Sequence, residues 1–256
     1  NVPKVYFVGC GPGDPDLITV KAKKLIQKAD VVVYSGSLIP SEILALCKKA
    51  RRYDAAKLVR EEIFDLLKKN AKKGKKVVRL HDGDPSIYGA IREQMDNLQK
   101  EKIDSIIIPG VTSFLASAAA LGAQLTLPGV TQTMIISRAE KRTKVPKREK
   151  ISELAKHRST MIFYLSVHLL SNIVKEALAG GYSKSTPVGV VYRASWSDEK
   201  IITGTLDTIT KRVRDQKITR TAIIIIGDVI KPKSYEYSKL YDKSFSHGFR
   251  KSRSKL

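Results

Sequence analysis

The hydrophobic and polar positions of this chain fall into two patterns, short apolar runs and longer stretches with helical spacing. Val77, Val78 and Leu80 form an apolar run of the length of a buried strand, and polar turn residues follow it at once. Beyond that turn Ile87, Ile91, Met95 and Leu98 recur at helical spacing. The pattern predicts a strand, a rigid polar loop and then a helix.

The same order recurs through the first half of the chain. Predicted strands cover residues 5–8, 31–33 and 106–108, and predicted helices cover residues 17–29 (with Thr19 as a cap), 40–48, 60–73 and 114–121. Right-handed crossovers place the carboxyl ends of such strands on one edge of a parallel sheet. We therefore expect the loops after three of these strands to meet at one cleft, where small ligands bind in open α/β sheets. The alternative is a set of ordinary connections without a ligand.

The second half predicts another α/β layer. Residues 126–130 look like a linker, after which come predicted strands at 134–136, 161–165, 188–192 and 223–226, with a helix at 169–178. We predict the fold class α/β, with two α/β domains at residues 1–125 and 126–232. Residues 233–256 form a basic tail, for which disorder is the default expectation.

Charge and composition narrow the classes of partner. The formal net charge of +22 over 256 residues favours polyanionic partners such as nucleic acid, an anionic membrane or a substrate with many carboxylates. A solvated basic surface without a macromolecular partner is the alternative. The sequence has neither an apolar run of about 20 residues nor a secretory signal, so we expect a cytoplasmic protein that does not enter the membrane. Two distant cysteines and four scattered histidines predict no metal site.

The first loop contains glycines at positions 9, 11 and 13, but it does not match a dinucleotide fingerprint. That motif is G-x-G-x-x-G, whereas here the third glycine comes too early and Pro12 stiffens the loop. A phosphate-binding G-K-[ST] sequence is missing as well. In the second half, Arg138 and Arg193 follow predicted strands, where a guanidinium suits carboxylate recognition. A surface salt bridge is the alternative for each.

Several of these stretches together resemble the tetrapyrrole methyltransferases that use S-adenosylmethionine. The resemblance covers nearly the whole chain and is carried by residues 9–19 (GCGPGDPDLIT), 82–85 (DGDP) and 109–113 (PGVTS). A second set resembles one branch, the precorrin-4 or cobalt-precorrin-4 C(11)-methyltransferases of cobalamin synthesis; it comprises residues 131–133, 138–140, 142–143, 145–146, 193–196, 198–199, 238–242 and 244–248.

The resemblance implies a cofactor cleft between the two domains, and a homodimer. S-adenosylmethionine is the implied cofactor, with S-adenosylhomocysteine as product. Its implied contacts are Pro12, Asp82, Gly83, Asp84, Ile87, Thr112, Ser113, Leu165, Ala194 and Ala222. The implied substrate is a polycarboxylated corrin precursor, gripped by Arg138, Arg142 and Arg193.

The chain departs from the family at several positions. Residues 35–37 (SGS) stand where some relatives carry an acidic residue, and Lys144 and Lys147 depart from the usual sequence of the substrate loop. We assign no general base; Asp54, near the place where some relatives have a lysine, is only a candidate. The predicted activity is methyl transfer to carbon 11 of the corrin precursor. The alternatives are another corrin carbon, or a basic protein of similar fold that acts on or binds RNA.

Overall fold

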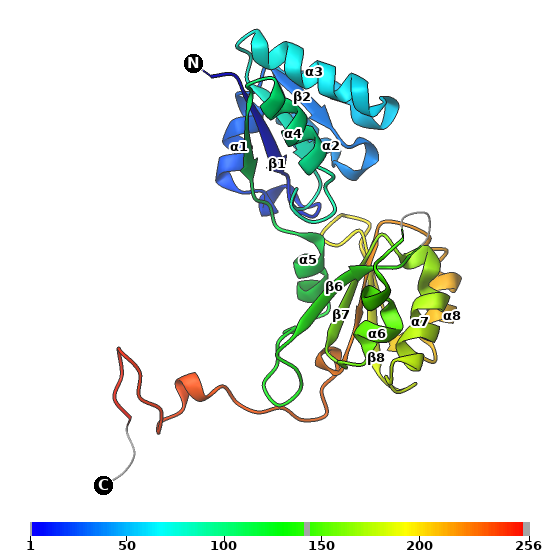
Figure 1. The fold of residues 1–256 in the computed structure, drawn as a ribbon. Coiled ribbons are helices and arrows are strands. Elements are labelled where there is room, and N and C mark those ends of the chain that lie inside the picture. Colours follow the sequence, from blue (N-terminus) through cyan, green and yellow to red (C-terminus); the bar gives the residue numbers. More distant parts are fainter. Residues whose placement is uncertain (1, 141–143, 253–256) are drawn as a thin grey trace. The chain divides into compact units, whose positions relative to one another are not determined.

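The structure, a computed structural model, describes residues 2–140 and 144–252 (Figure 1). The chain divides into two compact units, the first made of Asn1–Ala120 with Val191–Lys200, the second of Leu121–Val190 with Ile201–Leu256. The boundary between these units falls after Ala120, five residues before the predicted division at residue 125, and the composition of the units differs as well. The first unit takes a ten-residue segment from the predicted second domain, and the second unit includes the tail.

The first unit is built on a five-stranded sheet. Its strands are β1 (Lys4–Gly9), β2 (Val31–Tyr34), β3 (Arg51–Asp54), β4 (Val77–His81) and β5 (Asp104–Ile108), in the spatial order β3-β2-β4-β1-β5. Each neighbouring pair is parallel. The predicted parallel sheet is thus confirmed, with β3 as a strand that the sequence pattern did not indicate.

Helices cover both faces of this sheet. They are α1 (Val20–Gln27), α2 (Ser41–Ala45), α3 (Arg60–Lys72) and α4 (Arg92–Lys100). A fifth helix, α5 (Ser113–Ala120), follows β5 in the chain. Ile26 of α1 packs in one buried cluster with Val32 and Leu80, whereas Leu67 of α3 packs in another with Phe7. Because the central strands are buried on both faces, they read as continuous apolar runs.

Two helix starts can be compared with the prediction. Thr19 caps α1 as expected, since its hydroxyl accepts a hydrogen bond from the Ala22 N–H at 3.2 Å. The predicted start of α4 near Ile87 is wrong, because the chain makes a tight turn before Arg92. Tyr88 lies at φ +56° in this turn, and a Cβ on Gly89 would lie 2.1 Å from the Pro85 carbonyl oxygen.

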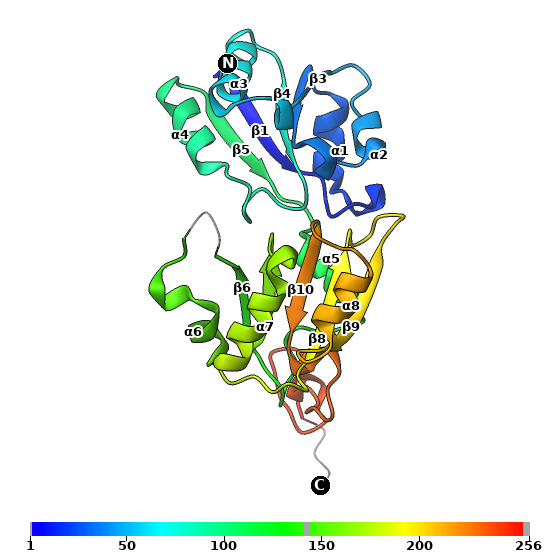
Figure 2. The ribbon, with the colours of Figure 1, turned by 90° about the vertical axis from the view of Figure 1, so that its right-hand side faces the viewer.

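The second unit is built on a mixed five-stranded sheet. Its strands are β6 (Met134–Arg138), β7 (Thr160–Tyr164), β8 (Pro187–Tyr192), β9 (Lys200–Thr205) and β10 (Ala222–Ile226), in the order β6-β7-β10-β8-β9. β6 and β7 are parallel, but β10 runs antiparallel to β7. Its helices, labelled in Figure 2, are α6 (Ile151–Ala155), α7 (Leu170–Ala179) and α8 (Ile209–Asp215). The sequence pattern had not indicated β9, α6 or α8.

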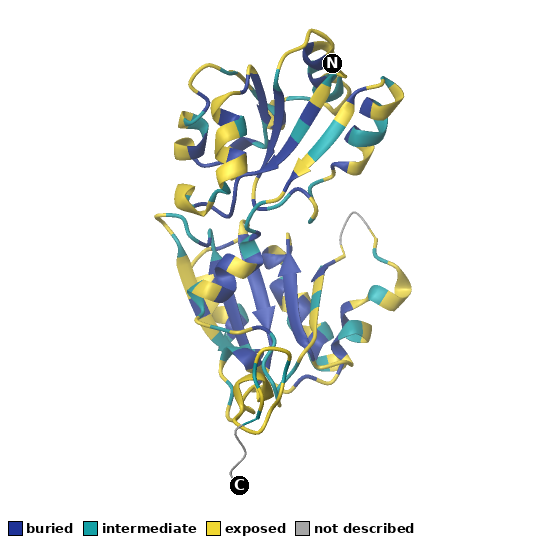
Figure 3. Cartoon of the chain, turned by 90° about the vertical axis from the view of Figure 1, so that its left-hand side faces the viewer, coloured by how far each residue is buried: buried dark blue, intermediate teal, exposed yellow. Residues whose placement is uncertain are grey.

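Burial follows the sheets. Strands β1, β4, β7 and β10 are buried for most of their length, whereas the outward faces of the helices are exposed (Figure 3). Most of residues 233–250 are exposed as well, although the Glu236 N–H donates to the Pro128 carbonyl at 2.9 Å. In the part of the chain that the structure describes, none of the helices has the length and apolar character needed to cross a bilayer.

Candidate functional site

Three loops leave the first sheet at neighbouring strand ends. Strand β1 pairs with β4 on one side and β5 on the other, with Gly9 level with His81 and Val8 level with Ile108. The loops that follow, residues 10–14, 82–91 and 109–112, therefore start at the same edge. This is the carboxyl edge, where open parallel sheets bind ligands.

Backbone contacts lock these loops together. The Gly83 N–H donates to the Gly11 carbonyl at 2.7 Å, and the Gly11 N–H donates back to the Gly83 carbonyl at 3.3 Å. That same Gly83 oxygen would lie 2.1 Å from a Cβ on Gly110 and 2.5 Å from one on Gly9. Glycine is therefore required by close approach at positions 9 and 110, and by φ +56° at Gly83. We call residues 9, 11, 83 and 110 the glycine junction.

Asp84 joins two of the loops through its carboxylate. Oδ2 accepts a hydrogen bond from the Gly110 N–H at 2.9 Å, and Oδ1 accepts one from the Ser86 N–H at 2.8 Å. Both oxygens thus hold loop backbone. The resemblance alone had assigned Asp84 to cofactor contact, and this positioning role could not be read from the sequence.

Asp82 presents a carboxylate beside the junction. The residue keeps an exposed surface, yet the protein packed around its carboxylate displaces enough water to raise the pKa of Asp82. A backbone hydrogen bond and the nearby charge of Arg79 act in the opposite direction. The carboxylate can accept hydrogen bonds from hydroxyl or ammonium groups of a ligand.

Two titratable side chains are buried directly behind this loop. Arg79 donates from Nη1 to the Val33 carbonyl, the Ser35 hydroxyl and the Leu80 carbonyl, each at 3.2 Å, and burial lowers the pKa of its guanidinium to about 10. Burial, with the Arg79 charge adding to it, lowers the pKa of His81 to about 3. Arg79 is thus charged and His81 neutral at pH 7.

A fourth segment of the first unit comes from far along the chain. Residues 193–199 link β8 to β9, and Ala194 is buried there. The Ser195 hydroxyl accepts a hydrogen bond from the Asp14 N–H at 3.0 Å, and Trp196 Nε1 donates to the Pro12 carbonyl at 2.8 Å. Sequence reasoning had listed Trp196 only within a family motif and missed its contact with the first loop. The contact spans 184 positions, which no local pattern reveals.

The first unit therefore contains most of the predicted cofactor residues. Eight of the ten lie on these four segments or, for Ser113, at the start of α5 directly after one of them; they are Pro12, Asp82, Gly83, Asp84, Ile87, Thr112, Ser113 and Ala194.

The other two predicted cofactor residues lie in the second unit. Ala222 begins β10 and Leu165 follows β7, and because these two strands are antiparallel both residues lie at the same edge of the sheet. Leu165 is 65% exposed and has φ +56°, an uncommon combination for a large apolar residue. Arg138 pairs with Tyr164 on the adjacent strand, so it lies at the same edge.

Three predicted residues remain, namely Arg142, Arg193 and Asp54. Arg142 lies outside the described residues. Arg193 carries its guanidinium 3.8 Å from the Trp196 ring centroid and pairs with Asp198 at 2.6 Å. The Asp54 Oδ1 accepts a hydrogen bond from the Ala56 N–H at 2.9 Å, which forms a turn at the end of β3.

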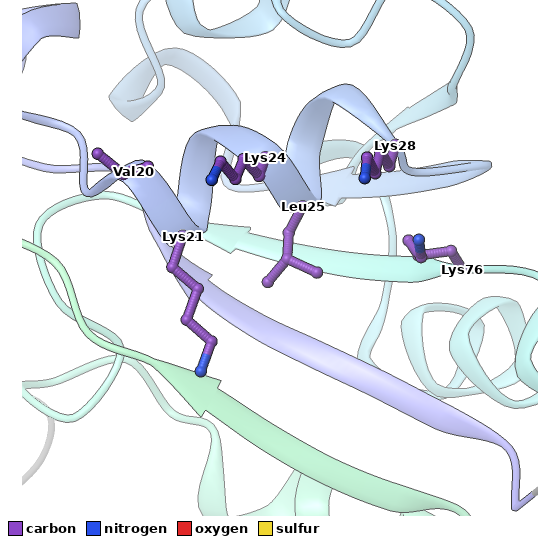
Figure 4. A pocket seen from close by; sticks show the side chains of 6 residues that line it. All are labelled: Val20, Lys21, Lys24, Leu25, Lys28 and Lys76. Carbon is purple, nitrogen blue, oxygen red and sulfur yellow. The ribbon is translucent and has the colours of Figure 1, made fainter.

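A shallow groove on α1 contains none of these residues. It is lined by Val20, Lys21, Lys24, Leu25, Lys28 and Lys76, whose side chains Figure 4 shows. The carboxyl-edge loops do not contribute to it. Separately, in residues 2–140 and 144–252, His, Cys, Asp and Glu side chains form no cluster of three or more that could hold a metal ion.

Comparison with known proteins places these features in a family. Residues 4–210 match the family model described as Tetrapyrrole (Corrin/Porphyrin) Methylases. A cobalt-precorrin-4 C(11)-methyltransferase of Methanocaldococcus jannaschii is 55% identical over 100% of this chain and 99% of its own length. One of Priestia megaterium is 48% identical, over 97% of this chain and 98% of its own.

Solved structures agree with this result. The X-ray structure of a cobalt-precorrin-4 methyltransferase has a TM-score of 0.87 and 46% identity, covering 90% of this chain and 96% of that one. A uroporphyrin-III C-methyltransferase of Thermus thermophilus, solved in complex with S-adenosylhomocysteine, has a TM-score of 0.76 and 30% identity, with coverages of 91% and 96%. The chain therefore belongs to the tetrapyrrole (corrin/porphyrin) methylase family.

Proposed function

We propose that this protein transfers a methyl group from S-adenosylmethionine to carbon 11 of cobalt-precorrin-4 or precorrin-4 in cobalamin biosynthesis. Relatives of that activity match the chain over nearly its full length, at 55% and 48% identity. The structural observation that carries the proposal is the glycine junction. It holds three loops at the carboxyl edge of a parallel sheet, where bare backbone can approach a ligand closely.

The methyl donor supplies an activated methyl group on a cationic sulfur, and methyl transfer is an in-line displacement by the ring carbon. The protein mainly has to bind and align the two reactants. Well-oriented reactants gain roughly 7–11 kcal/mol from preorganisation, which makes a nucleophilic side chain unnecessary. Asp82 is the carboxylate that accepts hydrogen bonds from the donor's hydroxyl or ammonium groups, whereas Asp84 keeps the loop in place.

Leu165 and Ala222 are the proposed apolar contacts for the donor. They lie at the same edge of the second sheet, and the exposed Leu165 side chain offers an apolar contact to a purine ring. The φ of +56° at Leu165 supports a functional role, because strained backbone tends to be retained at binding sites.

Arginines are the proposed partners of the substrate carboxylates. Arg138 lies at the same sheet edge as Leu165, and Arg142 and Arg193 complete the proposed set. The net charge of +22 suits a substrate with many carboxylates, because it raises the local concentration of anions. No general base is assigned, and Asp54 remains a candidate.

The proposal includes a cytoplasmic homodimer. Large apolar side chains are exposed on edge strand β5, on α5 and on edge strand β6, namely Ile107, Leu115, Met134 and Ile136. Exposed apolar edges of this kind favour burial against a second copy. Sedimentation of the purified protein measures this directly, and a monomer at micromolar concentration contradicts it.

The decisive experiment incubates the full chain with S-adenosylmethionine carrying a ¹³C-labelled methyl group and a panel of tetrapyrrole intermediates. We expect label at carbon 11 of precorrin-4 or its cobalt form, read by NMR of the product. Comparing the two forms shows which is the substrate. Failure of S-adenosylhomocysteine to bind in calorimetry contradicts the proposal outright.

A second candidate is transfer to another carbon of the corrin ring. It is favoured by the uroporphyrin-III C-methyltransferase structure, which shares this fold at 30% identity. Label at another carbon in the same experiment would establish it. Methylation or binding of RNA is the remaining alternative, and affinity that does not fall steeply with salt argues against it.

A further inference from the structure

The segment of residues 193–199 has an arrangement that substrate binding alone does not explain. It connects two strands of the second sheet, yet it belongs to the first unit. There it makes two hydrogen bonds to the first loop, one from Asp14 N–H to the Ser195 hydroxyl and one from Trp196 Nε1 to the Pro12 carbonyl. Both bonds hold backbone groups of the loop that contains the predicted cofactor contact Pro12.

The indole of Trp196 also fills the space beside Gly13. A Cβ on Gly13 would lie 2.1 Å from Trp196 Cδ1 and 2.4 Å from Nε1, both far inside van der Waals contact. Gly13 does not have a positive φ, so its backbone conformation suits any residue. Glycine is therefore needed at position 13 because the indole lies against it.

Trp196 is itself held in place. The Arg193 guanidinium lies 3.8 Å from the ring centroid, within the range of a cation–π contact, and its Nη1 pairs with Asp198 at 2.6 Å. The Glu199 carboxylate accepts a hydrogen bond from the Ser195 N–H at 2.6 Å. Arg193 and Ser195 have φ of +47° and +68°, a strained backbone that these contacts maintain.

We propose that Trp196, held by Arg193, is a positioning residue that fixes the Pro12–Gly13 backbone in the conformation that receives the methyl donor. This inference rests on the proposed function and adds to it a role for Arg193. The guanidinium acts on the cofactor loop through the indole, even when no substrate is present. The segment of residues 193–199 is therefore part of the donor site, although Trp196 need not touch the donor.

A double-mutant cycle between Gly13 and Trp196 tests the proposal. The dissociation constant for S-adenosylhomocysteine is measured by calorimetry for the wild type, Gly13→Ala, Trp196→Leu and the double variant. We expect each single change to weaken binding about tenfold. The double variant should be within about twofold of Trp196→Leu alone, because the added Cβ clashes only when the indole is present.

The indole position can be followed separately, because the sequence has one tryptophan. Its fluorescence in Gly13→Ala, measured without ligand, should move to longer wavelength as the added methyl group drives the ring into water. Trp196→Phe keeps an aromatic ring but loses Nε1 and with it the bond to Pro12, so it should bind with about threefold lower affinity and remain folded. Ser197→Ala, an exposed change on the same segment, is the control and should bind as the wild type does.

The outcomes separate this inference from the proposed function. If the wild type takes up no S-adenosylhomocysteine, both are wrong. If the wild type binds but Trp196→Leu and Trp196→Phe bind equally well, or if the two single losses multiply in the double variant, only the positioning role is wrong. In turnover, the role also requires that these variants raise KM for the methyl donor and leave KM for the tetrapyrrole unchanged, which a general loss of stability does not do.

Discussion

The two units differ in the direction of their strands, and therefore in which residues meet at a sheet edge. In the first unit all neighbouring strands are parallel, so loops that follow β1, β4 and β5 meet at one edge. In the second unit β10 is antiparallel to β7, so the end of one strand lies beside the start of the other. Ala222, which begins β10, thereby lies at the same edge as Leu165, which follows β7. In a mixed sheet some strands begin at the edge where their neighbours end. A search limited to residues that follow strands therefore finds only part of the residues at that edge.

The largest expected effect compares glycines of the two units. Gly110→Ala should cost about 3 kcal/mol, because the new Cβ would lie 2.1 Å from the backbone oxygen of Gly83 and the loops must move apart. Gly189→Ala in the second unit should cost about 1 kcal/mol, since the new Cβ meets the movable side chain of Leu121. Urea unfolding measures both.

Gly248→Ala is the control for this pair, because nothing lies within 4 Å of its added Cβ. We also expect Gly110→Ala to lose most of its affinity for S-adenosylhomocysteine. Equal costs at positions 110 and 189 would show that the glycine junction is no tighter than ordinary packing.

The next largest effect is a loss of folding stability at acid pH, which we assign to His81 in the first unit. Burial lowers the pKa of His81 to about 3 from an ordinary 6.5, so the unfolded chain takes up a proton below pH 6.5 that the folded chain refuses. This contribution to stability is complete above pH 6.5 and is lost as the pH falls toward 3, by up to about 1.4 kcal/mol per pH unit.

Replacing His81 should flatten that slope. His81→Phe can keep the stacking on Phe7. Between pH 6.5 and pH 5 we expect its free energy of unfolding, measured by urea titration, to fall by about 2 kcal/mol less than that of the wild type. His168→Gln in the second unit is the matched control, because His168 is exposed. A slope that is unchanged in His81→Phe would assign the acid sensitivity to other groups.

A smaller effect on ligand binding should distinguish Arg193 from Arg138. Arg193→Lys should weaken S-adenosylhomocysteine binding about fivefold in the absence of substrate, since a lysine ammonium cannot stack flat on the indole. Arg138→Lys should leave that affinity unchanged and raise KM for the tetrapyrrole about tenfold, through loss of bidentate carboxylate binding. If both variants change only the tetrapyrrole KM, Arg193 serves the substrate and not the loop.

The smallest effect is expected at Leu165. Changing it to glycine relieves a left-handed conformation that costs a larger residue roughly 1–2 kcal/mol, and costs about 0.5–1 kcal/mol in chain entropy. The net result should be a stabilisation of about 0.5 kcal/mol, visible in thermal unfolding, with weaker binding of S-adenosylhomocysteine. A loss of stability would mean that the exposed side chain supports the fold.

The sequence predicted the central strands well because they are apolar on both faces. It missed β3, whose four residues Arg51–Asp54 carry three charges at the edge of the sheet, and β9, which is also an edge strand. Few side chains of these two strands are buried, so their sequences lack a clear apolar signal. It also placed the start of α4 too early, because Ile87 continues the helical spacing while Gly89 and Pro85 force a turn.

The sequence indicated where the loops of the candidate site lie, but not which contacts Asp84 and Trp196 make within it. The loops at the carboxyl edge follow from parallel topology, and the residues in them follow from a family resemblance. That the Asp84 carboxylate holds loop backbone depends on a contact 26 positions away, and the Trp196 contact spans 184. Long-range contacts of this kind leave no periodic trace in a sequence.

The glycine junction has a consequence for engineering. The backbones at positions 9, 83 and 110 are so close that none of the three loops can be exchanged for a longer or bulkier one while the others stay in place. A chimaera with a sister enzyme must transplant all three corners as one block, or leave all three untouched and vary residues elsewhere.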